Sequence, residues 1–185
     1  MRRLVAALAT ATVAFGLLVG CGGENWTKKC TTSAAGVIEC TPDQRPQVDA
    51  VTGSLLGGGT YDVADDRGEV VVVNFWGSWC NPCRAEADDL EGTYQATKAK
   101  GVTFIGVNSR DDRDAAIAFE RGRVTYRSVY DPDGKVALKF DVTQVSTPST
   151  LILDRQGRIA VAMRRATVIS ELQPLVERVA AERTG

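Results

Sequence analysis

The chain has 185 residues, of which 44% are apolar and 24% charged, a composition that suits one globular domain with short appendages. Its 22 Lys and Arg residues balance 23 Asp and Glu residues, so no basic excess points to nucleic-acid binding. It contains no histidine, which excludes Ser-His-Asp and Cys-His catalysis and histidine-ligated metal sites. Five cysteines remain as the clearest carriers of chemistry.

The N-terminus has the pattern of an export signal. Arg2 and Arg3 precede an uncharged apolar run at residues 4–20, and a basic start before a short apolar stretch is typical of a secretory signal. The run ends in Leu-Val-Gly before Cys21, which resembles the lipobox of bacterial lipoproteins. We therefore expect a signal peptide at residues 1–20, a lipid on Cys21 and a place at the outer face of the cell membrane. An uncleaved membrane anchor is the alternative.

Residues 21–50 show little hydrophobic periodicity, and we interpret them as a tether to a domain at residues 51–185. Cys30 and Cys40 lie within this tether. In an oxidising compartment these two cysteines favour a structural disulfide with each other. A relay that passes electrons to the remaining cysteine pair is an alternative.

Regular elements follow in the second region. Strands at 52–56 and 60–63 flank three glycines and predict a hairpin. The β-branched and aromatic run at 70–76 predicts a buried strand, and residues 81–100 predict a helix that Gly101 ends. The remaining elements that we expect are a strand at 102–107, helices at 114–121 and up to Phe140, strands at 151–153 and 158–163 joined by a turn, and a C-terminal helix.

This order predicts an α/β fold with a central mixed β-sheet, helices on both faces and an N-terminal β-hairpin. Cys80 and Cys83 form a Cys-x-x-Cys motif where the buried strand meets the helix. Backbone N–H groups and the positive end of the helix dipole favour a thiolate there, which lowers a cysteine pKa. The alternatives are a purely structural disulfide, or half of a zinc site that Cys30 and Cys40 would have to complete.

The segment from Val72 to Glu86, which reads VVNFWGSWCNPCRAE, and the Ser-Thr-Pro-Ser-Thr run at 146–150 resemble the thioredoxin superfamily. The similarity is greatest to the membrane-anchored TlpA/ResA-like thiol-disulfide oxidoreductases, and it spans about residues 51–181. The resemblance implies a thioredoxin-like fold with a redox-active Cys80–Cys83 disulfide. It implies no cofactor and no bound metal.

The resemblance also assigns roles around these cysteines. Pro148 matches a cis-proline beside the active disulfide, and Thr147 matches the residue whose backbone pairs with the substrate. Glu86 matches a carboxylate near the cysteines of ResA-like proteins, which could exchange a proton with Cys83 if it is buried. A solvated surface glutamate is the alternative for Glu86. Trp79 is expected to contribute to a substrate platform.

These assignments predict an extracytoplasmic reductase of disulfides in exported proteins. Apocytochrome c is the substrate that the resemblance implies, during cytochrome c maturation, and a membrane thiol carrier of the CcdA/DsbD type is the implied electron donor. An oxidase of the DsbE/DsbA kind, which would install disulfides, is the main alternative. A thiol peroxidase and a copper chaperone of this fold are weaker ones, because the peroxiredoxin cysteine pattern and the chaperone's Cys-x-x-x-Cys and histidine are missing.

Overall fold

The computed structural model describes residues 26–48, 51–140 and 147–182. The expected signal peptide at 1–20 and the lipidated Cys21 lie outside the described residues. Within the described part of the chain, no helix is both long enough and apolar enough to cross a membrane.

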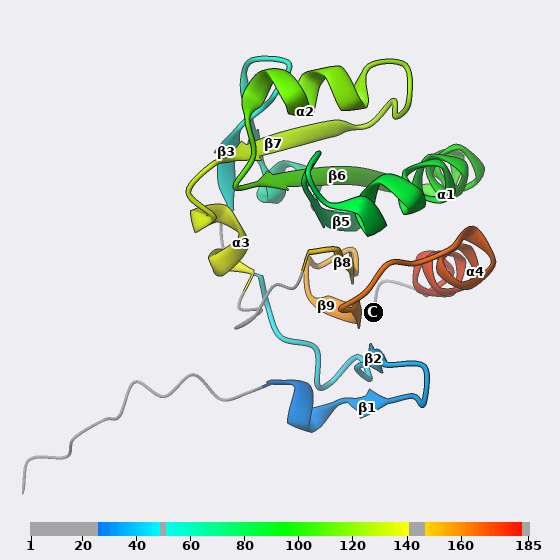
Figure 1. Cartoon of the computed structure of the whole chain (residues 1–185). Helices are drawn as coiled ribbons and strands as arrows, with labels where there is room; N and C mark the ends of the chain where they lie inside the picture. The colour runs from blue at the N-terminus through cyan, green and yellow to red at the C-terminus, as the bar shows by residue number, and fades with distance from the viewer. Residues whose placement is uncertain (1–25, 49–50, 141–146, 183–185) are drawn as a thin grey trace, which may run out of the picture.

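The molecule is built around a mixed sheet of seven strands in the order β1-β2-β9-β8-β5-β6-β7 (Figure 1). β5 and β6 are paired in parallel, with α1 as the crossover between them, and β7 extends this parallel group. β8, β9, β2 and β1 continue the sheet on the other side of β5 with antiparallel pairing. The strands are β1 Thr31–Thr32, β2 Val37–Glu39, β3 Thr52–Ser54, β4 Thr60–Asp62, β5 Val70–Trp76, β6 Val102–Ser109, β7 Arg127–Asp131, β8 Ser149–Leu153 and β9 Ile159–Met163; the α-helices are α1 Asn81–Thr97, α2 Arg113–Glu120, α3 Lys135–Lys139 and α4 Ile169–Ala180.

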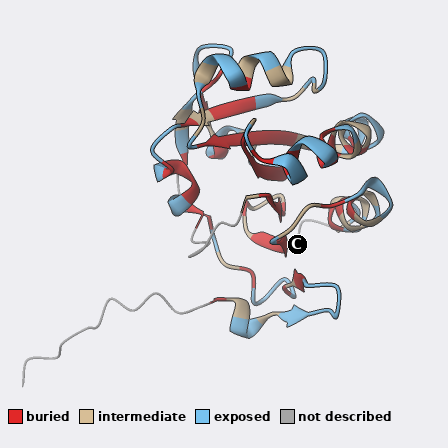
Figure 2. Cartoon of the chain, in the orientation of Figure 1, coloured by how far each residue is buried: buried red, intermediate tan, exposed pale blue. Residues whose placement is uncertain are grey.

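Both faces of the sheet are covered, which is why β5 is apolar at almost every position. On one face Val70 and Val72 pack in a cluster that includes Leu90 of α1 and Leu172 of α4. Alternate residues of β5 point to a second cluster on the other face, to which α3 contributes Val136. Figure 2 shows the buried strands between helices whose outer surfaces are exposed. The predicted α/β fold with helices on both faces is therefore confirmed.

The N-terminal segment differs from our interpretation of residues 21–50 as a tether. Within its described part, β1 and β2 form a hairpin, and β2 adds to the edge of the main sheet by pairing with β9. Trp26 is 6% exposed and Ile38 is 7% exposed, and both belong to the main core cluster. The segment carries two strands of only two and three residues, too short for a local alternation of apolar residues to reveal.

Of two further elements, one was predicted from the sequence and the other was not. The predicted hairpin is present as the β3–β4 pair, a separate two-stranded sheet. β7, in contrast, was not expected from the sequence. It is a short edge strand in which Ser128 and Val129 are buried next to β6.

The topology brings three loops to one end of the strands, where β5 and β6 finish and β8 begins. β5 and β6 run in parallel, so the loops that follow them leave from the same edge. β8 runs antiparallel to β5, with Phe75 opposite Ser149, and the segment before β8 therefore starts at that edge too. The Cys-x-x-Cys motif follows β5, so it lies where these loops meet.

Candidate active site

The Cys80–Cys83 disulfide forms the start of α1. The sulfurs are 2.08 Å apart, and the two residues are 4% and 3% exposed. Cys80 is the N-cap of the helix, and its Sγ accepts a hydrogen bond from the backbone N–H of Cys83 at 3.3 Å. Pro82 lies in the first turn, where its missing N–H costs no helical hydrogen bond. This placement favours a thiolate on Cys80 when the disulfide is reduced.

The loop before Cys80 presents one aromatic side chain to solvent and buries another. Trp79 is 56% exposed, whereas Trp76 at the end of β5 is 5% exposed and donates from Nε1 to Ser128 Oγ at 3.2 Å. A Cβ on Gly77 would lie 2.5 Å from Trp79 Nε1. Gly77 is therefore required for the indole of Trp79 to fold back over the loop in this position.

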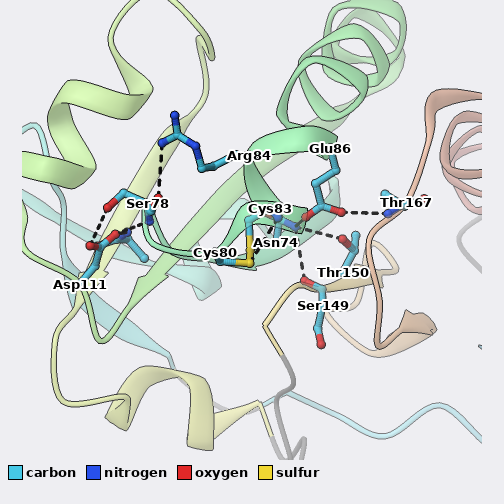
Figure 3. Close-up of a disulfide and its surroundings, with 11 residues drawn as sticks. Asn74, Ser78, Cys80, Cys83, Arg84, Glu86, Asp111, Ser149, Thr150 and Thr167 are labelled. Atoms are coloured by element: carbon cyan, nitrogen blue, oxygen red, sulfur yellow. Dashed lines mark hydrogen bonds between the residues drawn. A yellow bond between two sulfur atoms is a disulfide. The ribbon is translucent and has the colours of Figure 1, made fainter.

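Asp111, which is not among the site residues predicted from the sequence, fixes this loop. Its carboxylate accepts from the N–H of Ser78 at 2.5 Å, from the Ser78 hydroxyl at 2.8 Å and from Asn108 Nδ2 at 2.8 Å (Figure 3). Arg84 on α1 adds a contact of 3.4 Å to the Ser78 carbonyl. Asp111 lies two residues after the end of β6, so its position after a strand parallel to β5 was the signal that could have identified it.

Glu86 is buried behind the disulfide, one helical turn after Cys83. It is 1% exposed, and its two carboxylate oxygens accept from Asn74 Nδ2 and from the N–H of Thr167, each at 2.9 Å (Figure 3). Desolvation raises the pKa of Glu86 to about 7, and these two hydrogen bonds oppose the rise. The alternative of a solvated surface glutamate is therefore wrong.

Asn74 connects Glu86 with the segment around Pro148. Asn74 Nδ2 also lies 3.2 Å from Thr150 Oγ1 and 3.4 Å from the Ser149 carbonyl oxygen. Pro148 precedes Ser149, is buried and follows a cis peptide bond, while Thr147 is half-buried. The buried side-chain amide of Asn74 thus connects β5, α1 and the start of β8 at the end of the strands where the cysteines lie.

The second pair of cysteines is also bonded, at a different place. Cys30 and Cys40 form a disulfide with Cα atoms 4.5 Å apart, and Cys40 is 5% exposed. Both pack with the main core cluster, whereas Cys80 and Cys83 belong to a separate cluster with Trp76. β9 and β8 separate β2 from β5 in the sheet. Among the described residues these four sulfurs lie in two separate disulfides, so they do not come together as the zinc site that Cys30 and Cys40 would have completed.

Comparisons with known proteins agree with this geometry. The chain matches the AhpC/TSA family over residues 43–162. It is 40% identical over 94 residues to the thiol:disulfide interchange protein HelX of Rhodobacter capsulatus, and 30% identical over 103 residues to the thiol-disulfide oxidoreductase ResA of Bacillus subtilis. These matches cover 50% and 55% of this chain, and 50% and 56% of the respective relative. The chain thus spans about half the length of these relatives.

Solved structures extend the similarity to nearly the whole fold. A secreted thiol-disulfide isomerase from Corynebacterium glutamicum is 30% identical with a TM-score of 0.76, over 79% of this chain and 92% of that one. A DsbF homologue from Corynebacterium diphtheriae is 31% identical with a TM-score of 0.73, over 80% of this chain and 98% of that one. The resemblance to ResA-like thiol-disulfide oxidoreductases of the thioredoxin superfamily is thereby confirmed. The chain belongs to the AhpC/TSA family within the thioredoxin superfamily, and its relatives are thiol-disulfide oxidoreductases of the ResA, DsbE and HelX type.

Proposed function

We propose that this protein is an extracytoplasmic thiol-disulfide oxidoreductase that reduces disulfides of exported proteins through Cys80 and Cys83. The observation that carries the proposal is a disulfide at the first turn of α1, with an exposed tryptophan before it and a buried carboxyl one turn after it. The names of the relatives support the reaction class.

In the proposed reaction Cys80 is the nucleophile. Its thiolate attacks one sulfur of a substrate disulfide, and the other substrate sulfur leaves as a thiolate. Cys83 then loses its proton and attacks Cys80 in the mixed disulfide. The second substrate sulfur leaves, and the Cys80–Cys83 bond forms. Two electrons have then passed from the protein dithiol to the substrate.

Glu86 is proposed to influence the second half of this reaction. Its raised pKa, about 7, lets it change charge in the pH range where thiol exchange is fast. A protonated Glu86 stabilises a nearby thiolate better than an ionised one, because like charges in a buried site repel each other. Asn74, which carries no charge, holds the carboxyl in place through the 2.9 Å hydrogen bond.

The surroundings of the disulfide supply a proposed substrate surface. Trp79, half exposed at the mouth of the site, offers an apolar platform, and the backbone at Thr147 precedes the buried Pro148. An extended substrate segment is proposed to lie against both. Apocytochrome c remains the substrate that the sequence resemblance suggests, with a membrane thiol carrier of the CcdA/DsbD type to regenerate the dithiol.

The proposed location follows from the N-terminal sequence. A signal peptide at residues 1–20 and a lipid on Cys21 would hold the domain at the outer face of the cell membrane. Metabolic labelling with a radioactive fatty acid tests this, and a Cys21→Ala variant that still incorporates the label would contradict it.

The reduction potential of the Cys80–Cys83 couple tests the direction of electron flow. We expect the purified protein, equilibrated in glutathione or dithiothreitol buffers, to show a potential near about −270 mV or lower, as thioredoxin does. A potential near about −120 mV, as in DsbA, would mean that the reduced form is unusually stable. The protein would then be an oxidase that installs disulfides, and the reductase proposal would be wrong.

A further inference from the structure

A small cavity lies behind Cys83, on the inner side of the disulfide. Its wall includes Cys83 itself, Asn74 and Trp76 of β5, Glu120 at the end of α2, and Tyr126. The space open to water is about 10 Å³, which is roughly the room that one molecule needs. A buried cysteine that must release a proton thus has a polar neighbour across a gap of the size of one water.

Glu120 has an unsatisfied carboxyl oxygen at this position. Its Oε1 is buried and has no hydrogen-bond partner among the described residues, although such groups are nearly always paired in folded proteins. Burial raises the pKa of Glu120, and a hydrogen bond with Ser128 opposes the rise. Most of the cavity wall is apolar, so this unpartnered oxygen is the group that a water bound in the cavity would be expected to satisfy.

The other side of Glu120 reaches the protein surface. Glu120 also lines an open hollow of about 320 Å³ that includes Leu56, Gly57 and Arg121. Glu120 therefore lines both the interior space next to Cys83 and a space open to solvent. Glu86, in contrast, is 1% exposed and both of its oxygens already accept hydrogen bonds, so it has no comparable opening.

Neighbouring groups hold Glu120 in this position. Trp76 Nε1 donates to Ser128 Oγ at 3.2 Å, which leaves the Ser128 hydroxyl proton for its hydrogen bond with Glu120. A Cβ on Gly106 would lie 2.0 Å from Ser128 Oγ and 2.7 Å from Trp76 Nε1. Gly106 of β6 is therefore required for the hydrogen bond between Trp76 of β5 and Ser128 of β7.

From this geometry we propose that Glu120 is the proton relay between solvent and the thiol of Cys83. The proposal rests on the function proposed above. When Cys83 attacks the mixed disulfide, its proton passes through one water to the Glu120 carboxylate and from there to the open hollow. The Cys83 thiolate forms the bond to Cys80, and the substrate sulfur leaves with the electron pair of the bond that breaks.

The other titratable groups around Glu120 do not offer this route. Tyr126 stays protonated because burial and the charges of Glu120, Glu86 and Glu91 raise the pKa of its hydroxyl far above neutral. Arg121, which lines the outer hollow, is exposed and carries a permanent charge. Asn74 and Trp76 do not titrate. Among the groups that line the inner cavity, Glu120 is thus the carboxyl that can change charge.

The two thiol steps can be observed separately with dithiobis-nitrobenzoate, an aromatic disulfide. Attack by Cys80 releases the first coloured thiolate, and attack by Cys83 on the mixed disulfide releases the second. The leaving group needs no proton, so the second phase depends on how readily Cys83 loses its own. Stopped-flow traces of the reduced protein across a range of pH therefore measure the proposed step directly.

We expect Glu120→Gln to leave the first phase unchanged and to slow the second phase about tenfold, a modest share of what general acid–base catalysis contributes. The Glu120→Asp variant keeps a carboxyl and should recover most of the rate. Glu69→Gln removes an equal charge from an exposed position at the opposite end of β5, and it should change neither phase.

The outcomes separate the two proposals. If Glu120 acts only as a negative charge, its removal lowers the pKa of the Cys83 thiol and speeds the second phase. A second phase that is faster or unchanged in Glu120→Gln therefore overturns the relay. If the wild-type protein shows no first phase, the proposed function fails independently of Glu120. Equal denaturant midpoints for Glu120→Gln and wild type exclude misfolding as the cause of a slower second phase.

Discussion

The two disulfides of this protein lie in very different surroundings, although three of their four cysteines are buried and only Cys30 is partly exposed. Cys40 is 5% exposed and Cys80 is 4% exposed. The tryptophan before Cys30, Trp26, is 6% exposed and packs into the main core cluster, whereas Trp79 before Cys80 is 56% exposed. The Cys30–Cys40 bond joins the ends of a hairpin at the edge of the sheet, and the Cys80–Cys83 bond forms the first turn of a helix.

Exposure of the sulfurs therefore does not indicate which disulfide reacts. The features that differ are the helix N-terminus, the buried carboxyl and the exposed aromatic side chain, all of which occur at Cys80–Cys83. The separation of 10 residues between Cys30 and Cys40 gives that bond a larger effect on the unfolded chain than a separation of three. One disulfide is thus expected to affect chemistry and the other stability.

The largest effect is expected for Cys80→Ser. Without the nucleophile, catalysed reduction of insulin disulfides by dithiothreitol should fall to the rate without protein. The Cys30→Ser/Cys40→Ser double variant serves as the control and should keep the wild-type rate under conditions where it is folded. Activity that survives in Cys80→Ser would mean that Cys80–Cys83 is not the disulfide that carries the reaction.

Cys83→Ser should stop the reaction halfway instead of abolishing its first step. The Cys80 thiolate still forms a mixed disulfide, but no second thiol is present to resolve it. Adducts that are sensitive to reducing agent should therefore accumulate on non-reducing gels. If Cys40→Ser trapped adducts to the same extent, a relay from Cys30 and Cys40 would replace the structural interpretation of that pair.

Much of the reactive region was predictable because its signals are local. The strand at 70–76 and the helix from Asn81 are encoded within short windows, and the structure has β5 and α1 there. The predicted helix continues past Thr97 as a 3-10 turn at Lys98–Lys100, which Gly101 ends. The resemblance to ResA-like members of the thioredoxin superfamily could be inferred largely from the same windows. Glu86 could be placed near Cys83 from helical spacing alone, although its burial requires the N–H of Thr167, which is distant in sequence.

The region around the other disulfide was less predictable, since its burial depends on distant partners. Val37 and Ile38 are buried because β2 pairs with β9, which lies far along the chain. The roles of Asp111 and Glu120 likewise depend on tertiary contacts, with Ser78 and Ser128 respectively. For Asp111 the one available signal is its position after a strand parallel to β5, and no pattern around Glu120 distinguishes its carboxylate from an ordinary surface acid.

Glu86 should give the stability of the reactive region a measurable pH dependence. Its pKa is about 7 in the folded protein against 4.5 as the reference value. Between these values the folded state binds more protons than the unfolded state, so the free energy of unfolding falls as the pH rises. The loss is on the order of 3 kcal/mol for one group with this shift.

Urea unfolding at about pH 5 and about pH 8 checks this prediction. Glu86→Gln should unfold more easily at low pH, because the amide nitrogen cannot accept from Thr167, but its decline with pH should be smaller than that of the wild type. Glu177→Gln, at an exposed ion pair with Lys100, is the control. An equal decline in wild type and Glu86→Gln would mean that Glu86 does not titrate in this range.

Removal of the other disulfide should affect stability without changing the exchange chemistry. The Cys30→Ser/Cys40→Ser variant should lose about 2–3 kcal/mol of unfolding free energy, as expected for a loop of this length. The reduction potential of Cys80–Cys83 should remain the same within error, because β8 and β9 lie between the two regions. A shifted potential would show that the N-terminal hairpin influences the reactive site.

Substitution of the exposed Trp79 is expected to have the smallest effect, and that effect should be on substrate binding. Trp79→Ala removes an apolar surface beside Cys80, which should weaken binding of a protein substrate by about 1 kcal/mol and raise KM several-fold with little change in kcat. Leu138→Ala, which removes a side chain that is 69% exposed on α3, tests whether any exposed apolar residue would do the same. Because neither residue is part of the core, both variants should unfold close to the wild-type midpoint.

An unchanged KM in Trp79→Ala would leave the helix N-terminus and the buried carboxyl as the features that separate the reactive disulfide from the structural one. A raised KM would show that the outward position of Trp79, in contrast to the buried Trp26, serves substrate binding.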